Sequence, residues 1–237
     1  MTGQPQEEVW PAGRRYPGGE PSAGIETLHA FSFADFYDPA NLRFGMLLAC
    51  NEERLTPGAG FAEHTHRDTE IVTWVIEGEL EHRDADGTAT RLRAGDAQLL
   101  SAGAGVRHVE RNPGPAPLRF LQMWLHPDPA GGPPRHTVAA GAVPAGPGLF
   151  PLASAAPGAA LPLRQPHAAL HLARGAQDLP AAPFQYVHVL RGRVRIGAAR
   201  LGPGDALRAT GAPARRADAA PDAEYLVWRM TAEPTYG

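Results

Sequence analysis

The sequence predicts an all-β protein made of two similar β-barrels in tandem. Glycine (27) and proline (25) are abundant among the 237 residues and are spread along the chain. Between them lie short runs rich in β-branched and aromatic residues, which is typical of strands joined by tight turns. A weaker copy of the pattern of the first half returns after residue 148. The alternative is a duplicated sandwich whose sheets do not close into barrels.

The strongest strand signals lie in a continuous stretch of the first half. Residues 70–76 are mostly apolar and β-branched, and Glu77-Gly78 makes a turn into a second strand at residues 79–83. Residues 84–87 form another turn, whose Asp-Gly step supplies the positive φ of a tight hairpin, and residues 88–93 follow it. Two hairpins in succession are typical of a meander or a barrel.

Two more strands and a loose segment complete the first half. Residues 97–100 predict a short strand, and residues 118–125 predict the second arm of a pair around the turn at 113–115. From residue 127 to 148, clusters of glycine and proline cannot continue a ladder or a helix. We therefore expect a first barrel at 1–127, a linker at 128–148 and a second barrel at 149–237.

The second half repeats three patterns of the first. Residues 187–194 resemble residues 73–80, since both read as an apolar strand, a charged residue, a glycine and a further strand. Residues 201–207 repeat the pattern of residues 92–98, and residues 224–230 repeat the arm that carries Trp124. Two barrels in tandem explain these repeats most simply.

Composition excludes several classes of function. The formal net charge is −3 and the pI is near 6.4, so we expect no direct binding to nucleic acid, although a partner protein could bridge to it. The only cysteine, Cys50, lies in an apolar run and predicts a core residue, which excludes internal disulfides and a cysteine-rich zinc site. The absence of lysine excludes Schiff-base chemistry. Without a signal-peptide pattern or a run of about 20 apolar residues, we expect a cytoplasmic monomer away from membranes.

Two pairs of metal-binding side chains stand out. His64 and His66 are separated by one residue before a strand, and His108 and Glu110 repeat this spacing about forty residues later. Side chains two residues apart on an extended backbone point to the same face, so each pair can reach one ion. Three imidazoles and one carboxylate suit Fe, Mn, Ni, Cu or Zn better than Ca or Mg, which prefer oxygen. On an octahedral metal two positions would stay open.

Longer motifs around these pairs resemble the pirin family of bicupins. They are Phe31 to Pro39, Gly60 to Thr73, Glu77 to Asp84, and the stretch from Gly95-Asp96 to Glu110. The resemblance runs from about residue 28 to 126. It implies two tandem cupin barrels and one mononuclear divalent metal, foremost Fe(II), with Mn, Ni, Cu or Zn as alternatives.

The resemblance also implies which residues bind that metal. Both histidines of the first pair, the later histidine and the glutamate after it fall on His64, His66, His108 and Glu110. Glu70 occupies the place where many other cupins have their ligand glutamate, so it is the alternative carboxylate. In the pirin pattern it packs nearby without binding the ion.

The second half departs from this pattern. Residues 183–186 lead straight into a strand without a His-x-His, and Ala217 and Ala219 stand where His108 and Glu110 would be. The second barrel is therefore expected to bind no metal. The remaining histidines of interest are interpreted as structural or solvent-exposed: His167, His171 and His188, with His82 as a solvated strand position beside its turn.

The resemblance implies two functions of different classes. Some pirin-like proteins cleave the flavonol quercetin with dioxygen, so this chain would be a dioxygenase acting on a flavonol-like aromatic substrate, with Glu110 as a general base. Others are described as transcriptional co-regulators, in which the redox state of the metal changes the surface that meets a partner protein. A purely structural metal is the third possibility. Strand alternation suggests that Phe61, Trp74 and Gln122 line the substrate pocket.

Overall fold

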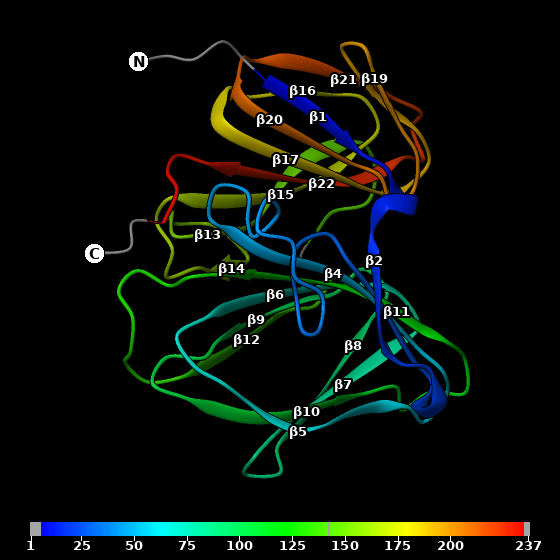
Figure 1. The fold of residues 1–237 in the computed structure, drawn as a ribbon, viewed down its shortest axis with the longest axis vertical. Coiled ribbons are helices and arrows are strands. Elements are labelled where there is room, and N and C mark those ends of the chain that lie inside the picture. The colour runs from blue at the N-terminus through cyan, green and yellow to red at the C-terminus, as the bar shows by residue number, and fades with distance from the viewer. Residues whose placement is uncertain (1–5, 142, 235–237) are drawn as a thin grey trace.

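The computed structural model describes residues 6–141 and 143–234, and it confirms the all-β prediction. The only helical segments among these residues are two single 3₁₀ turns, η1 (Ala12–Arg14) and η2 (Pro21–Ala23). The strands form two units stacked one above the other, and in Figure 1 the first half of the chain, apart from β1, lies below the second. Each unit consists of a seven-stranded and a four-stranded sheet.

The lower unit is the first barrel. Its seven-stranded sheet has the order β12-β9-β6-β11-β4-β3-β2, and its four-stranded sheet has the order β5-β10-β7-β8. In chain order the strands are β2 (Tyr16–Glu20), β3 (Ile25–His29), β4 (Leu47–Leu55), β5 (Gly60–His66), β6 (Glu70–Glu77), β7 (Glu79–Asp84), β8 (Ala89–Arg93), β9 (Ala97–Ser101), β10 (Val106–Arg111), β11 (Leu118–Leu125) and β12 (Arg135–Ala139).

The upper unit repeats this arrangement as a second barrel. Its two sheets have the orders β1-β20-β17-β22-β15-β13-β14 and β16-β21-β18-β19. The strands are β1 (Gln6–Trp10), β13 (Gly148–Ser154), β14 (Leu161–Pro162), β15 (Ala168–Arg174), β16 (Gln177–Leu179), β17 (Ala182–Arg191), β18 (Val194–Ile196), β19 (Ala199–Leu201), β20 (Ala206–Ala212), β21 (Arg215–Ala219) and β22 (Glu224–Met230). Because the ladders of each unit form two separate sheets, each barrel is flattened.

One of the two predicted hairpins is wrong. β7 and β8 pair across the Asp-Gly turn as expected, but β6 and β7 lie in different sheets. Gly78 connects them at φ +80°, and a Cβ there would lie 2.5 Å from the carbonyl oxygen of Pro117. Only glycine tolerates this close approach, so residue 78 turns the chain from one sheet to the other instead of folding it back. The strands before and after the turn at 113–115 likewise belong to different sheets.

Two segments pair into sheets in a way that the sequence did not predict. β1 pairs with β20 of the second barrel, with Glu8 opposite Arg208. β12 lies inside the expected linker, where glycine and proline suggested that no ladder could continue, yet it pairs with β9 over its whole length. Residues 135–139 contain neither glycine nor proline, so a strand can form there between the glycine- and proline-rich segments on either side.

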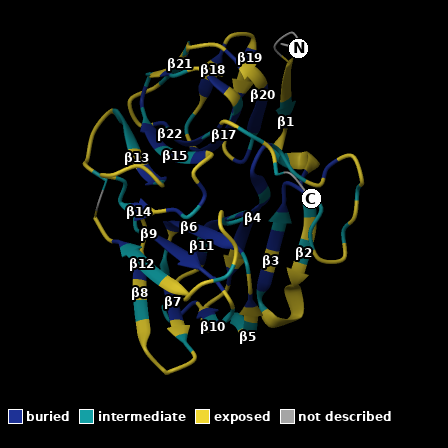
Figure 2. Ribbon diagram, turned by 90° about the vertical axis from the view of Figure 1, so that its left-hand side faces the viewer, coloured by how far each residue is buried: buried dark blue, intermediate teal, exposed yellow. Residues whose placement is uncertain are grey.

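The two barrels share one hydrophobic core. Val72, Trp74 and Ile76 of β6 pack in the same cluster as Leu226, Trp228 and Met230 of β22. A second apolar cluster fills the inside of the second barrel, whereas a smaller cluster occupies part of the first. Figure 2 shows the buried residues concentrated where the barrels meet and the exposed residues along the outer loops. Cys50 is buried and unpaired in the shared core, as the sequence predicts.

Across residues 6–141 and 143–234, no helix has the length and the apolar character that crossing a membrane would require.

Candidate metal centre

Two adjacent strands bring the predicted ligands to the inner face of the first barrel. In the ladder between β5 and β10, His64 lies opposite His108 and His66 lies opposite Val106. Residues opposite each other on antiparallel strands share a face, so His64 and His108 meet directly. The register shifts between His108 and Glu110 because β5 carries the extra residue of a bulge there, with Phe61 opposite Glu110. The ladder of β10 with β7 runs on without a shift, so His108 and Glu110 share a face.

The three histidines converge. Their ring centroids lie 4.5 to 5.0 Å apart, and one ligating atom from each lies within 4.8 Å of the others. The rings are tilted against each other by 52° to 88°. Imidazoles around one ion have this arrangement, because each lone pair must point to a common centre.

The hydrogen bonds of these rings leave nitrogen atoms free to bind a metal. His64 Nδ1 donates to the carbonyl oxygen of Ala62 at 2.8 Å, which leaves Nε2 as its acceptor. His66 Nε2 and His108 Nε2 are buried and make no hydrogen bond in the protein. A buried unpaired nitrogen is costly, and a metal ion would satisfy these atoms, so the residues fit the metal that the sequence suggests.

Glu110 is fully inside the barrel and is held by two amides. Gln98 Nε2 donates to Oε1 at 2.8 Å, and Gln122 Nε2 donates to Oε2 at 2.5 Å. Its carboxylate falls within 4.8 Å of atoms of His108 and His82, and it lines the same cavity as His64 and His66. Glu110 therefore adjoins the three histidines on the side of His108.

The protonation states suit metal binding. Burial lowers the pKa of His66 and of His108 to about 4, so both rings are neutral near pH 7. Burial alone would raise the pKa of Glu110, but hydrogen bonding from His82 and the nearby histidines outweigh it and lower that pKa to about 2. Neutral imidazoles and an ionised carboxylate are the forms that bind metal.

A cavity of about 320 Å³ opens above these residues. Aromatic walls and polar groups surround it: Phe33, Asn51, Glu53, Phe61, Ala62, Glu63, His64, His66, Glu110, Gln122 and Trp124. Phe33 comes from the loop between β3 and β4, and its ring meets Trp124 edge to face at a centroid distance of 5.0 Å. An apolar cavity with a few convergent polar groups is the usual form of a small-molecule site.

Two of the three predicted lining residues are correct. Phe61 and Gln122 line the cavity, but Trp74 does not: it is 1% exposed and packs in the core between the barrels. On β6 the even-numbered residues face that core. Trp124 is the tryptophan of the cavity, and its place on β11 two residues after Gln122 would have indicated the same face.

The prediction for His82 is wrong. It is not a solvated strand position but fully buried, and it lies opposite Glu110 in the ladder between β7 and β10. Its ring is 4.7 Å from that of His108 and stacks on His136 of β12 at 4.0 Å. Position 82 faces inward because it alternates with the outward residues Glu81 and Arg83, which the strand pattern alone does not distinguish.

Glu70 and the histidines of the second barrel lie apart from the three histidines. Glu70 accepts hydrogen bonds from Ser101 Oγ and from the backbone nitrogen of Arg164, at 2.9 and 3.0 Å. His188 is buried in the second barrel against Arg15, and His167 bonds Thr231. All three groups of potential metal ligands among the described residues come from residues 64–136.

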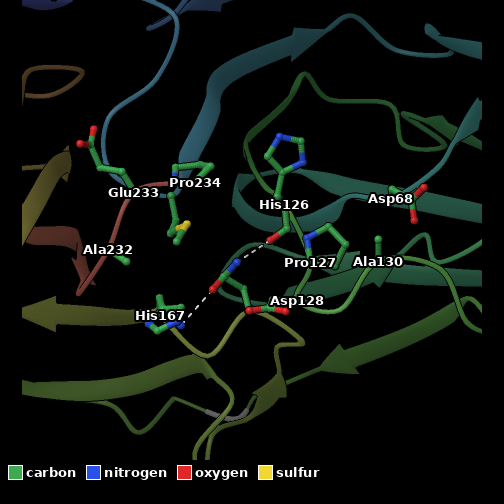
Figure 3. A pocket seen from close by; sticks show the side chains of 11 residues that line it. Asp68, His126, Pro127, Asp128, Ala130, His167, Ala232, Glu233 and Pro234 are labelled. Carbon is green, nitrogen blue, oxygen red and sulfur yellow. Dashed lines mark hydrogen bonds between the residues drawn. The ribbon is translucent and has the colours of Figure 1, made fainter. Parts of the chain in front are cut away.

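A second cavity, of about 450 Å³, lies beside the junction of the barrels. It holds His126, His167, Asp68, Asp128 and Glu233. Figure 3 shows these side chains spread around the cavity and not directed to one point. The arrangement does not resemble a metal or catalytic centre.

Known proteins resemble this chain, some over its first half and others over most of its length. The Pirin family model matches residues 13–125. A Mycobacterium tuberculosis protein named "Putative quercetin 2,3-dioxygenase" is 41% identical over 220 residues, which cover 88% of this chain and 89% of that protein. The quercetin 2,3-dioxygenase of Escherichia coli K12 is 41% identical over 113 residues, or 47% of this chain and 49% of that protein.

The whole fold matches a solved structure as well. The bacterial pirin YhhW of Escherichia coli, in complex with nickel(II), superposes with a TM-score of 0.87 at 29% identity. The match covers 96% of this chain and 100% of that one. The pairing of two barrels is therefore a feature that this chain shares with that protein.

Proposed function

The chain belongs to the Pirin family, and from this premise we propose that it is a metal-dependent dioxygenase of the quercetin 2,3-dioxygenase type. It would open the ring of a flavonol-like substrate with dioxygen. The observation that carries the proposal is the set of converging histidines, with buried unpaired nitrogens, beneath an aromatic cavity. The names of the relatives in Mycobacterium tuberculosis and Escherichia coli support the same reaction.

In this proposal, His64, His66, His108 and Glu110 hold one divalent metal ion. Three imidazole nitrogens and a carboxylate suit Fe(II), Mn, Ni, Cu or Zn, and we propose Fe(II) among them on the resemblance to the family. The ion supplies Lewis acidity toward a substrate hydroxyl and redox chemistry toward dioxygen. The domain division at 1–127, 128–148 and 149–237, with the metal in the first barrel alone, belongs to the same proposal, except that β1 pairs into the second barrel and β12 into the first.

The chain's own residues bind and orient the substrate. Phe33, Phe61 and Trp124 offer aromatic faces and edges to a planar ring system. Glu110 is ionised near neutral pH, and it would accept the proton of a substrate hydroxyl that a bound metal makes more acidic. Gln98 and Gln122 fix its two oxygens by hydrogen bonds, so the carboxylate keeps its orientation in a space that excludes bulk water.

Spectroscopy with quercetin tests the proposed reaction. Iron-loaded protein, mixed with quercetin without oxygen, should shift the flavonol absorption band, and admission of air should consume one dioxygen per flavonol as that band disappears. A protein that binds one metal ion but neither shifts the band nor consumes oxygen is not a quercetin dioxygenase. That result would favour the alternative of a co-regulator that acts by protein contact.

Substitution of ligands tests the proposed metal site separately. Elemental analysis of protein purified without added metal should find one transition-metal ion per chain, and His64→Ala or Glu110→Ala should abolish stoichiometric binding. His167→Ala is a matched control, because His167 lies in the second barrel and its ring bonds Thr231 Oγ1, while its backbone nitrogen donates to Gln165 Oε1. Retention of one ion in either ligand variant would refute the assignment.

A further inference from the structure

We infer that Asp84 and His82 are positioning residues that fix the tautomer and the ring orientation of His108, and that His136 ties the same network to Glu110. This inference rests on the proposed metal site. It concerns residues that do not touch the ion or the substrate, and it assigns a role to the buried histidine that strand patterning left unexplained.

Three side chains form a chain of hydrogen bonds from the inside of the barrel toward its surface. His108 Nδ1 lies 3.3 Å from His82 Nδ1, and His82 Nε2 lies 3.2 Å from Asp84 Oδ1. If His108 offers Nε2 to a metal, its proton sits on Nδ1, and that N–H donates to His82 Nδ1. With a metal bound, His82 would carry its own proton on Nε2 and donate it to Asp84, so its Nδ1, 4.0 Å from Glu110 Oε1, would no longer donate to that carboxylate. The carboxylate thus determines both tautomers.

A second branch reaches Glu110. His136 stacks on His82 with an interplanar angle of 21°, and its Nε2 lies 2.9 Å from Gln98 Oε1. A donor at that nitrogen orients the amide, so that Gln98 Nε2 faces Glu110 Oε1 at 2.8 Å. One network therefore holds two of the four proposed ligands, His108 and Glu110. Its member His136 lies on β12, the last strand of the first barrel.

The second barrel provides an internal comparison. In the ladder between β10 and β7, His108 and Glu110 lie opposite Asp84 and His82. In the equivalent ladder between β21 and β18, Ala217 and Ala219 lie opposite Ile196 and Val194. Where the two ligands are replaced by alanine, both positioning residues are replaced by aliphatic ones. This pattern is expected if His82 and Asp84 position the proposed metal ligands and are not required for the fold of the barrel.

The same residues do not form a second ion site of their own. His82, Asp84 and His136 have ligating atoms within 4.8 Å of one another. However, the two rings are nearly parallel at a centroid distance of 4.0 Å, so their in-plane lone pairs run side by side. Convergent rings, such as those of His64, His66 and His108, are what an ion requires.

Asp84→Asn tests the inference at a half-exposed position where the fold tolerates change. Loss of such a partner weakens metal binding by about 10- to 100-fold, so the apparent dissociation constant for Zn(II) or Co(II), measured against a chelator, should rise by at least tenfold. Asp86→Asn is the matched control, because Asp86 lies in the same turn, is exposed and bonds only within that turn, to Thr88. It should bind metal as the unmodified protein does.

Spectroscopy separates positioning from general loosening. The visible d–d bands of the Co(II) protein should shift in Asp84→Asn, and the Fe(III)/Fe(II) potential should rise, because His108 becomes a weaker donor. A tenfold change in relative affinity corresponds to about 59 mV for one electron. His82→Phe keeps the ring and its stacking on His136, and it should show the same shifts if Asp84→Asn fails to fold.

Each other outcome has a definite meaning. If the unmodified protein binds no metal, the proposed function fails together with this inference. If it binds one ion and Asp84→Asn matches the Asp86→Asn control in affinity and spectrum, only the positioning role is overturned. If it binds two ions and Asp84→Asn binds one, the three residues form a second metal site, and the positioning role is likewise overturned.

Discussion

Two glutamates of one cavity have pKa values shifted in opposite directions. Both Glu53 and Glu110 line the aromatic cavity and are nearly inaccessible to solvent. Burial raises the pKa of Glu53 to about 8, against a hydrogen bond from Thr27. Glu110 is equally buried, but the histidines beside it lower its pKa to about 2. Near pH 7 the cavity therefore contains one neutral carboxyl group and one carboxylate, which suit donation and acceptance of hydrogen bonds respectively.

Glu53 predicts how the stability of the metal-free protein depends on pH. Its folded pKa of about 8 lies above the value of about 4.3 in the unfolded chain. Between these values the unfolded state loses the proton first, so the contribution of Glu53 to stability is complete below the lower pKa and falls as pH rises toward 8. Glu53→Gln removes this dependence. Between pH 5.5 and 7.5 the unmodified protein should lose up to about 1.4 kcal/mol per pH unit relative to the variant.

Urea unfolding of both proteins across that range measures the difference. Glu63→Gln is the control, because Glu63 also borders the cavity but is exposed, and it should leave the slope unchanged. Other groups that affect stability in this range, such as His66 and His108, which titrate there only in the unfolded chain, are common to all three proteins and cancel in the comparison. Parallel curves for Glu53→Gln and the unmodified protein would contradict a raised pKa.

At the scale of the strand, β10 and β21 show how similar ladders carry different chemistry. β10 faces polar side chains from the opposite sheet, including Gln98 and Gln122. β21 faces the apolar cluster of the second barrel, with Leu207 and Val194 among its members. A metal site therefore needs the polar lining of the whole barrel and not only ligands at two positions of one strand.

Transfer of the two ligands to β21 should consequently fail to create a site. Ala217→His combined with Ala219→Glu buries an imidazole and a carboxylate against aliphatic side chains, which costs several kcal/mol. We expect no bound metal and a clearly lowered melting temperature. Arg216→His with Asp218→Glu puts the same groups on the outward face of β21 and should cost little. Stoichiometric metal in the inward double variant would show that two ligands suffice.

Alternation along a strand is local, and this explains which site residues the sequence could predict. The pairs His64/His66 and His108/Glu110 each share a face by spacing alone, and the structure brings the three histidines together. The sequence does not indicate that the side chain of His82 points inward, because charged residues flank it on both sides. Its direction depends on the ladder with β10. His136 could not be predicted as its neighbour, because it lies 54 residues later in a segment that glycine and proline marked as a linker.

The same limit applies to the fold, because only features that depend on a few neighbouring residues could be predicted. Turn residues and strand runs predicted most strands of both halves, since these signals also act over a few residues. The corner at Gly78 and the pairing of β1 with β20 depend on contacts between distant segments. The Asp-Gly turn could be interpreted correctly because its geometry by itself requires a hairpin.

At the scale of the whole molecule, polar contacts fix the two barrels across their shared core. Arg15 lies 3.7 Å from Glu52 of the first barrel and 2.9 Å from His188 of the second. Arg191 donates to the carbonyl oxygen of Ile76, and Arg208 donates to that of Ala30. These contacts form only when both barrels are in place, so separation of the barrels would expose apolar surface and leave polar groups unpaired.

We therefore expect the two barrels to unfold in a single cooperative transition. Trp74 of β6 and Trp228 of β22 are both fully buried in the shared cluster, and Trp228 Nε1 donates to Met123 Sδ across the junction at 3.1 Å. Replacement of a buried tryptophan by alanine costs about 3–5 kcal/mol, and Trp74→Leu or Trp228→Leu should cost somewhat less. Because one core serves both barrels, each variant should shift the same transition to lower temperature.

Scanning calorimetry of the metal-free protein distinguishes the possibilities. One transition with equal calorimetric and van't Hoff enthalpies is expected for all three proteins, and Tyr37→Leu, at a position that is 73% exposed, should leave the midpoint nearly unchanged. If the barrels were independent, two transitions would appear, and each tryptophan variant would shift only its own. In a single transition, destabilisation of the second barrel by Trp228→Leu must also lower the temperature at which the first barrel loses the arrangement of its proposed metal ligands, although none of those residues has changed.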